Sequence, residues 1–316
     1  MCLTHRQHPH EIKCFAALCY TGFMRIGGFE VKEPFPALKE PHAIAVLRPW
    51  VDAGSVGTLV LQNLEILYGS TVLARLIRPG SFYDFTRYRP TTRFKKGTRE
   101  LVIPNTVVSY AIRDNENDLV FIHLLEPHNM GEAYTSLVWQ FLKTLGIKRY
   151  CLIGSFYDAV PHTRPIIVSG GTSNKRLQAK LRKLAINQNR YEGPTTICNL
   201  ISQEAEKAGV ETLTLLAHLP QYAELEEDYL GILAIKKALF SLYDISIDEE
   251  DVLNAESQLK TIEIAVQKDR KLKAMVNELE RQYDSRFTFD RNPEESTLSP
   301  EVDKFLKEME NRFKEP

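Results

Sequence analysis

Long apolar segments are missing from this 316-residue chain, and so is an excess of one charge. Its apolar runs stay well below the roughly 20 residues that a membrane-spanning helix needs, which excludes an integral membrane protein. The 40 Lys and Arg residues balance 41 Asp and Glu residues, so the net charge is −1. Such a balance gives no general attraction for polyanions, so we expect no membrane partner and disfavour nucleic acid as a partner.

Cysteine is scarce, and its spacing contains no C-x-x-C pair. An odd number of scattered thiols excludes a disulfide framework and a zinc ribbon, and it favours the reducing cytoplasm. The five cysteines are Cys2, Cys14, Cys19, Cys151 and Cys198.

The common catalytic motifs are also missing. The turn from Trp50 to Gly57 retains only G-x-x-G, and no Gly-Lys-Ser/Thr follows it, so no nucleotide loop is present. No G-x-S-x-G occurs, and Gly154-Ser155 is the nearest approach to a hydrolase nucleophile. No pair of histidines has the spacing of metal ligands on a helix. We therefore predict no cofactor, no metal and no ATP hydrolysis.

Residues 1–23 show neither a helical nor a strand period. Their apolar stretch from Cys14 to Tyr20 is short for a signal peptide and follows Glu11. Because Met24 offers a second start, we interpret residues 1–23 as a disordered arm or a wrongly assigned extension.

Charge and aromatic residues are present but unevenly placed. From Glu249 to the end, 12 basic residues stand against 17 acidic ones, whereas the preceding part has an excess of basic residues. Arg75 to Arg99 holds eight basic residues and one acid, interleaved with aromatic rings. Such a stretch can bind nucleic acid by stacking, but we favour a charged edge strand and protein interface. The opposite signs suit self-association.

Strand patterns alternate with helix patterns through residues 24–247, which predicts one α/β domain with a mostly parallel central sheet. Buried strands are predicted at 42–48, 71–77, 118–125, 149–154, 165–169 and 211–219, and helices at 55–68, 132–145, 173–184, 195–208 and 228–243. Shorter strands at 82–89, 100–104 and 106–113 predict an antiparallel insertion.

The C-terminal part changes character. Apolar residues at alternating spacings of three and four predict one long amphipathic helix over 248–284. This appendage either packs on its own domain or forms a helical hairpin or intersubunit zipper. Residues 285–316 are predicted to be a flexible tail with a short helix after Pro300.

Polar loops follow or abut the predicted parallel strands, and such loops share one edge of a sheet. Their carboxylates, imidazoles and guanidinium suit acid–base chemistry or a polar ligand site. The candidate site residues are Asp52, Gly54 and Gly57; Glu126 and His128; Asp158, His162, Thr163 and Arg164; and Tyr191, Glu192 and Thr195.

The same residues also suit a structural network. Asp52 would cap the following helix, while the two glycines allow close packing. Arg164 would be a hub that pairs with Asp158 or holds two carboxylates at once. Both interpretations of the loops stay open at this point.

Five short motifs resemble, in order and spacing, the proteasome assembly chaperone 2 family in its prokaryotic form. They lie within residues 44–283 and are Trp50-Val-Asp-Ala-Gly54-Ser-Val-Gly57, Phe82-Tyr-Asp-Phe85 with Arg89-Pro90, Glu126-Pro-His128, Val160-Pro-His-Thr-Arg-Pro165 and Tyr191-Glu-Gly-Pro-Thr195. The resemblance implies a phosphorylase/hydrolase-like α/β fold, a C-terminal helical appendage and homo-oligomers. It implies no established reaction.

The favoured hypothesis is a non-catalytic protein-binding or assembly-chaperone-like protein whose partners are itself and a further protein. The alternative is an enzyme or small-ligand-binding protein of the same fold that uses the loop carboxylates and His162.

Overall fold

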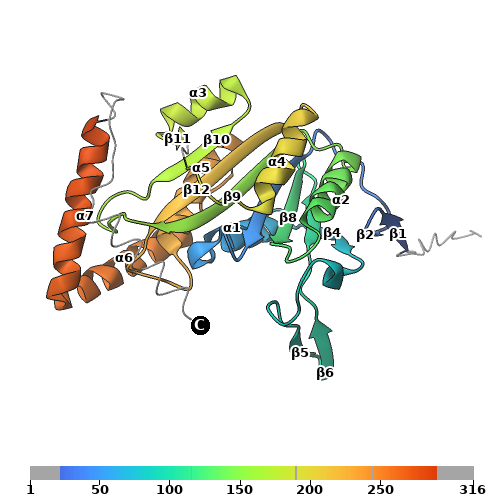
Figure 1. Cartoon of the computed structure of the whole chain (residues 1–316), viewed down its shortest axis with the longest axis horizontal. Coiled ribbons are helices and arrows are strands. Elements are labelled where there is room, and N and C mark those ends of the chain that lie inside the picture. The colour runs from blue at the N-terminus through green and yellow to red at the C-terminus, as the bar shows by residue number, and fades with distance from the viewer. Residues whose placement is uncertain (1–21, 115, 189–190, 244, 290–316) are drawn as a thin grey trace, which may run out of the picture.

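A ten-stranded sheet forms the centre of the protein in a computed structural model that describes residues 22–114, 116–188, 191–243 and 245–289 (Figure 1). Its four middle strands are parallel to one another and lie side by side in the order β8 (Leu119–Leu125), β3 (His42–Arg48), β9 (Arg149–Asp158) and β12 (Glu211–Pro220). The predicted α/β fold with parallel strands at its centre is confirmed, but in the whole sheet five of the nine strand pairings are antiparallel.

Antiparallel strands extend this parallel core on both sides. Next to β8 lie β7 (Val107–Ala111), β4 (Thr71–Leu76), β2 (Phe29–Lys32) and β1 (Phe23–Ile26). Next to β12 lie β10 (Val168–Thr172), which is antiparallel to it, and β11 (Asn187–Gln188). The sequence analysis did not predict β1 and β2, because each has only four residues.

Helices cover both faces, as the unbroken apolar run of β3 requires. Ala45 and Leu47 pack on the face of α2 (Gly131–Thr144) and α4 (Ile197–Lys207). Ile44 and Val46 alternate with them and pack on the opposite face. That face is covered by α1 (Val56–Leu67), α3 (Lys175–Lys183) and α5 (Tyr229–Tyr243).

The segment predicted as a strand over 82–89 is instead a run of turns. Tyr83 is buried there, and its hydroxyl lies 3.0 Å from that of Tyr134 and 2.5 Å from Oγ1 of Thr106. After it, β5 (Thr91–Lys95) and β6 (Thr98–Val102) pair only with each other as a hairpin that projects from the body (Figure 1). We call this hairpin the arm.

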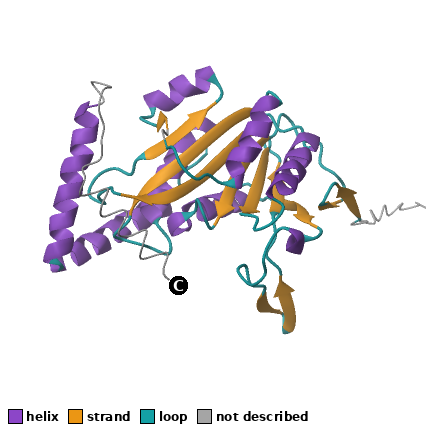
Figure 2. Ribbon diagram, viewed as in Figure 1, coloured by secondary structure: helices purple, strands orange, loops and turns teal. Residues whose placement is uncertain are grey.

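The single helix predicted over 248–284 is wrong, because the chain forms two helices at an angle, α6 (Glu249–Lys268) and α7 (Arg270–Phe289) (Figure 2). Asp269 between them is extended, and its carboxylate accepts the backbone N–H groups of Lys271 and Leu272. It therefore ends one helix and caps the next.

The predicted boundaries of the terminal segments 1–23 and 285–316 are wrong, because Phe23 already pairs with Lys32 in β1 and α7 continues to Phe289. The remainder of these two expectations, over residues 1–21 and 290–316, lies outside the described residues.

Candidate functional site

The turn after β3 is held from inside by Asp52. One carboxylate oxygen accepts the backbone N–H of Thr58 at 3.0 Å, and the other accepts its hydroxyl at 2.5 Å. Burial is the main influence on this carboxyl and raises its pKa, although the bonds from Thr58 act the other way. Asp52 thus caps the first turn of α1, as the structural interpretation of this residue predicted.

The two glycines of this turn have separate roles. Gly54 has a φ of +55°, which L side chains rarely adopt. A Cβ on Gly57 would lie 2.7 Å from Cγ2 of Val46 and 3.1 Å from the carbonyl oxygen of Ile153. Only glycine therefore lets α1 approach the sheet this closely.

Glu126, at the end of β8, is turned towards the start of α4. Its two carboxylate oxygens lie 3.2 and 3.3 Å from the backbone N–H of Ile197, the first residue of that helix. A carboxylate is favoured there by the helix dipole. Burial raises the pKa of Glu126, and the bond from Ile197 acts in the opposite direction.

His128 faces the turns that replace the predicted strand. Its Nδ1 accepts the backbone N–H of Asp84 at 3.2 Å, and its ring meets that of Tyr88 edge-on, 4.6 Å between centroids. Tyr88 in turn donates its hydroxyl to the carbonyl of Glu126. These groups border an open hollow of about 770 Å³ that also includes Trp50.

Tyr191, Glu192 and Thr195 lie in the exposed loop that leads into α4. The Thr195 hydroxyl accepts a hydrogen bond from the side chain of Asn199 within the same segment. The loop leads directly to Ile197, whose backbone N–H binds Glu126, so it lies at the Glu126 end of the sheet.

Asp158, at the end of β9, pairs with a histidine. Its Oδ2 lies 2.8 Å from Nδ1 of His218 on β12, and its Oδ1 accepts the backbone N–H of Ala159 at 2.7 Å. The predicted pairing of Asp158 with Arg164 is wrong, because Arg164 reaches carboxylates elsewhere.

His162 is buried against Tyr222, which follows β12. The tyrosine hydroxyl lies 2.7 Å from the backbone nitrogen of His162 and 2.5 Å from its Nδ1. Burial lowers the pKa of His162, although the negative charges of Glu263 and Glu280 act to raise it.

Arg164 clamps its loop to α7. Its Nε and Nη2 donate to the two oxygens of Asp284 at 2.8 and 2.7 Å, and its Nη1 donates to Glu280 at 3.3 Å. Thr163 also donates to Glu280, and Tyr283 donates to the Pro165 carbonyl at 2.8 Å. The predicted hub does hold two carboxylates, but both belong to the C-terminal appendage.

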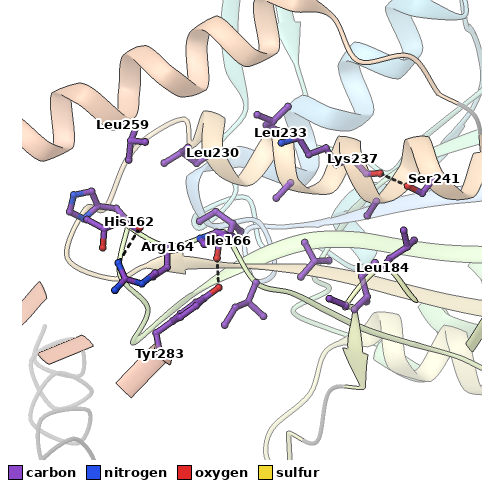
Figure 3. Close-up of a pocket in the computed structure, with 18 of the residues that line it drawn as sticks. His162, Arg164, Ile166, Leu184, Leu230, Leu233, Lys237, Ser241, Leu259 and Tyr283 are labelled. Atoms are coloured by element: carbon purple, nitrogen blue, oxygen red, sulfur yellow. Dashed lines mark hydrogen bonds between the residues drawn. The ribbon is translucent and has the colours of Figure 1, made fainter. Parts of the chain in front are cut away.

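A groove of about 920 Å³ runs beside this clamp (Figure 3). His162 and Arg164 lie at one end of it and Leu184 at the other, and Tyr283 borders it. Leu230, Leu233 and other apolar side chains of α5 form much of its lining.

The predicted loops therefore do follow parallel strands, but their side chains form separate clusters. Asp52 is tied to α1, Glu126 to α4, and Arg164 to α7. A backbone bridge joins Asp52 to Ser155 on β9, and the backbone N–H of Gln221 donates to the carbonyl of Asp158. These contacts do not bring the predicted loop residues together in one acid–base site.

Four partners escaped the sequence analysis: Ser169, His218, Glu280 and Asp284. The sequence did carry a signal for His218. Apolar residues alternate along β12 and pack on the face of α5, so His218, at an even-numbered position between two of them, lies on the opposite face of the sheet. Glu280 and Asp284 carried no such signal, since they lie more than a hundred residues from Arg164.

The parallel core, its antiparallel flanks and the appended helices define a mixed α/β protein with helices on both faces. Within the described ranges, no helix combines the length and the apolarity that crossing a bilayer requires. The sequence pattern of the PAC2 family matches residues 46–267, and the chain belongs to that family.

Solved structures share this fold. A PAC2 family protein from Streptomyces avermitilis is 27% identical, with a TM-score of 0.66, over 75% of this chain and 99% of its own. A proteasome-assembly chaperone homologue from Mycobacterium tuberculosis is 23% identical, with a TM-score of 0.65, over 74% and 99%. An archaeal proteasome activator from Pyrococcus furiosus is 16% identical, with a TM-score of 0.58, over 76% and 97%. No curated protein matches the chain.

Proposed function

We propose that this chain is a protein-binding, assembly-chaperone-like protein of the cytoplasm that forms homo-oligomers and binds a further protein. The observation that carries the proposal is the arm. Every residue of its two strands is exposed, although a lone two-stranded hairpin is marginally stable in water. Covering it with another protein chain would stabilise it.

The arm offers the chemistry of an interface. Phe94 is 76% exposed and Leu101 is 64% exposed. In the register of the hairpin, Phe94 lies opposite Arg99, and Leu101 lies opposite Thr92, so these four residues share one face. Aromatic side chains and arginine are enriched at protein interfaces.

Charge complementarity favours a second copy of the chain as one of the proteins that cover the arm. The arm carries Arg93, Lys95, Lys96 and Arg99, whereas α6 begins with Glu249 and Glu250. The arm and α6 lie at different ends of the molecule (Figure 1), so this complementarity acts between copies. It would steer copies into a head-to-tail arrangement.

The relatives support a protein partner. Among the proteins of similar fold are one described as a proteasome-assembly chaperone homologue and one described as a proteasome activator. By analogy we propose an oligomeric protein assembly as the further partner of this chain, with fold-level likeness as the support.

Light scattering on the full chain tests the proposal. We expect a mass that is a multiple of 36.2 kDa at micromolar concentration. The double variant Phe94→Ser, Leu101→Ser should shift the mass towards one copy. Ile66→Ser on α1 is the matched control, because Ile66 is 79% exposed outside the arm.

A wild-type mass of one copy would overturn the homo-oligomer. An oligomer that persists unchanged in the double variant would overturn the role of the arm.

The contacts do not favour the enzyme that would combine the loop carboxylates with His162. Asp52 and Glu126 bind helix N-termini, and the Nδ1 of His162 is occupied by Tyr222. Any chemistry at this edge must rest on residues other than Asp52, Glu126 and His162.

A further inference from the structure

We propose that Ser169, His218 and Asp158 form a catalytic site that hydrolyses small carboxylic esters, an activity separate from protein binding. The three residues come from three adjacent strands, β10, β12 and β9. Nδ1 of His218 lies 2.8 Å from Asp158 Oδ2, and its Nε2 lies 2.8 Å from Ser169 Oγ. A nucleophile, a base and a carboxylate that orients the base are thereby linked in a chain.

The sheet register places these side chains together. Phe156 of β9 pairs with His218 of β12 in parallel, so Asp158 lies two residues further along on the same face. Ser169 pairs with Leu216 in the antiparallel β10–β12 ladder, which makes His218 its diagonal neighbour. The arrangement is built on strands, which hold side chains more precisely than loops do.

The hydrogen bonds also set the protons. An ionised carboxylate only accepts, so Nδ1 of His218 donates to Asp158. In the neutral imidazole Nε2 is then the acceptor, and it receives the hydroxyl proton of Ser169. The backbone N–H of Ala159, 2.7 Å from Oδ1, helps to keep the Asp158 carboxylate in position.

There is space beside the serine. Ser169 is 6% exposed, and Gly171 lies two residues on, on the same face. A Cβ on Gly171 would meet nothing within 4 Å. The half-buried Leu216 and Phe156 make the neighbouring surface apolar, which suits a short acyl group.

Ser155, in the sequence Gly154-Ser155, is a different case. It is fully buried and donates its hydroxyl to the carbonyl of Ala53 at 2.6 Å. It is a structural residue, so the serine of Gly154-Ser155 is not the nucleophile.

The reaction follows from these positions. Ser169 Oγ attacks the ester carbonyl carbon and forms a C–O bond while its proton passes to Nε2 of His218. The bond to the alcohol oxygen then breaks, and the alcohol leaves with that proton. Water from solvent attacks the acyl-serine and gives a proton to Nε2, and the carboxylic acid departs as Ser169 regains its proton. The sum is ester plus water to acid plus alcohol.

Labelling with a fluorophosphonate probe tests the nucleophile on the full chain, with p-nitrophenyl acetate as the ester. We expect one adduct per chain, mapped by peptide mass to Ser169 and absent in Ser169→Ala. His218→Gln should slow both labelling and ester hydrolysis at least 100-fold, the lower range for loss of a general base. Ser257→Ala, an exposed serine on α6, is the matched control and should label like wild type.

No adduct on the wild-type chain would overturn the proposal. So would an adduct at another residue, or labelling of Ser169 that persists at full rate in His218→Gln.

A second test uses a thiol at the position of the serine and compares only variants that remain folded. In Ser169→Cys, we expect iodoacetamide to alkylate Cys at position 169 at least tenfold faster than in the double variant that also carries His218→Gln. Burial raises the pKa of Cys151 and Cys198 to about 12, so these thiols should stay unreactive in the folded chain. Equal rates at position 169 in two folded variants would show that His218 does not act on this residue.

Discussion

Two parts of the molecule extend beyond the sheet, the appendage of α6 and α7 and the arm of β5 and β6, and they are held in opposite ways. The appendage is bound back by an ion pair from Lys236 to Asp251, by the Arg164 clamp, and by an apolar cluster that includes Ile262 and Val276. Both strands of the arm have only exposed residues.

This difference separates structure from binding. Polar groups in the loops near the appendage have partners within the same chain, and removing one should affect folding. The apolar and basic groups of the arm face solvent, so removing one should affect association. The predictions below test this division, from the largest expected effect to the smallest.

Lys236→Ala should have the largest effect. Lys236 is buried on α5, and its Nζ lies 2.7 Å from each carboxylate oxygen of Asp251 on α6. Removal of the ammonium leaves a largely buried carboxylate without its counter-charge, which costs about 3–5 kcal/mol. Urea unfolding measures the loss.

Lys237→Ala is the matched control for that change, because Lys237 is the next residue on the helix and is exposed. It should stay within about 0.5 kcal/mol of wild type. A similar small loss in Lys236→Ala would show that the ion pair does not hold the appendage.

Acidification should destabilise the body through His42. Burial, aided by the charge of Arg149, lowers the pKa of His42 from 6.5 to about 4. The unfolded chain therefore takes up this proton first, so the contribution is complete above about pH 6.5 and is lost as the pH falls towards 4. Burial lowers the pKa of His162 too, which adds a contribution of the same sign near the appendage.

Unfolding of wild type, His42→Gln and His162→Gln at pH 7.5 and 5.5 separates these two contributions. Each variant should lose less stability on acidification than wild type does, and His42→Gln the least of all. Asp52 and Glu126, whose pKa values burial raises, act in the opposite direction in all three proteins. If His42→Gln loses as much stability between pH 7.5 and 5.5 as wild type does, the prediction is contradicted.

Arg164→Ala should loosen α7 rather than unfold the body. Its guanidinium is partly exposed, and its hydrogen bonds with Asp284, together with the charges of Asp284 and Glu280, raise its pKa above the ordinary value. Hydrogen exchange of the α7 amides should become faster, and Arg164→Lys should restore only part of the protection because the fork is lost. Arg281→Ala, an exposed arginine on the same helix, should leave exchange unchanged. Unaltered exchange in Arg164→Ala would mean that the clamp does not secure α7.

The sequence predicted the parallel core well, because its strands are short apolar runs with helix patterns between them. The break between α6 and α7 at Asp269 was harder to predict, since apolar residues continue at spacings of three and four on both sides of it. Its signal was the shift of phase between Val266 and Leu272, together with an aspartate suited to capping. Similarly, Asp84 accepts the N–H and hydroxyl of Thr86, so the segment predicted as a strand turns locally.

The site was less accessible from sequence than the fold. Which residues follow parallel strands is a local property, and the loops at Asp52, Glu126 and Asp158 were identified from it. Which partner each side chain meets depends on tertiary packing. Arg164 reaches across 120 residues to Asp284, and His218 joins two other strands.

Phe94→Ala should have the smallest effect on the single chain. An exposed side chain contributes little to folding, so the free energy of unfolding should stay within about 0.5 kcal/mol of wild type in dilute solution. Phe29→Ala gives the contrast, because Phe29 is buried and stacks on Phe141, and its loss costs about 3–5 kcal/mol. If copies associate through the arm, a stability difference for Phe94→Ala should emerge only as protein concentration rises. A large loss in dilute solution would mean that the arm is part of the fold after all, and the contrast with the appendage would fail.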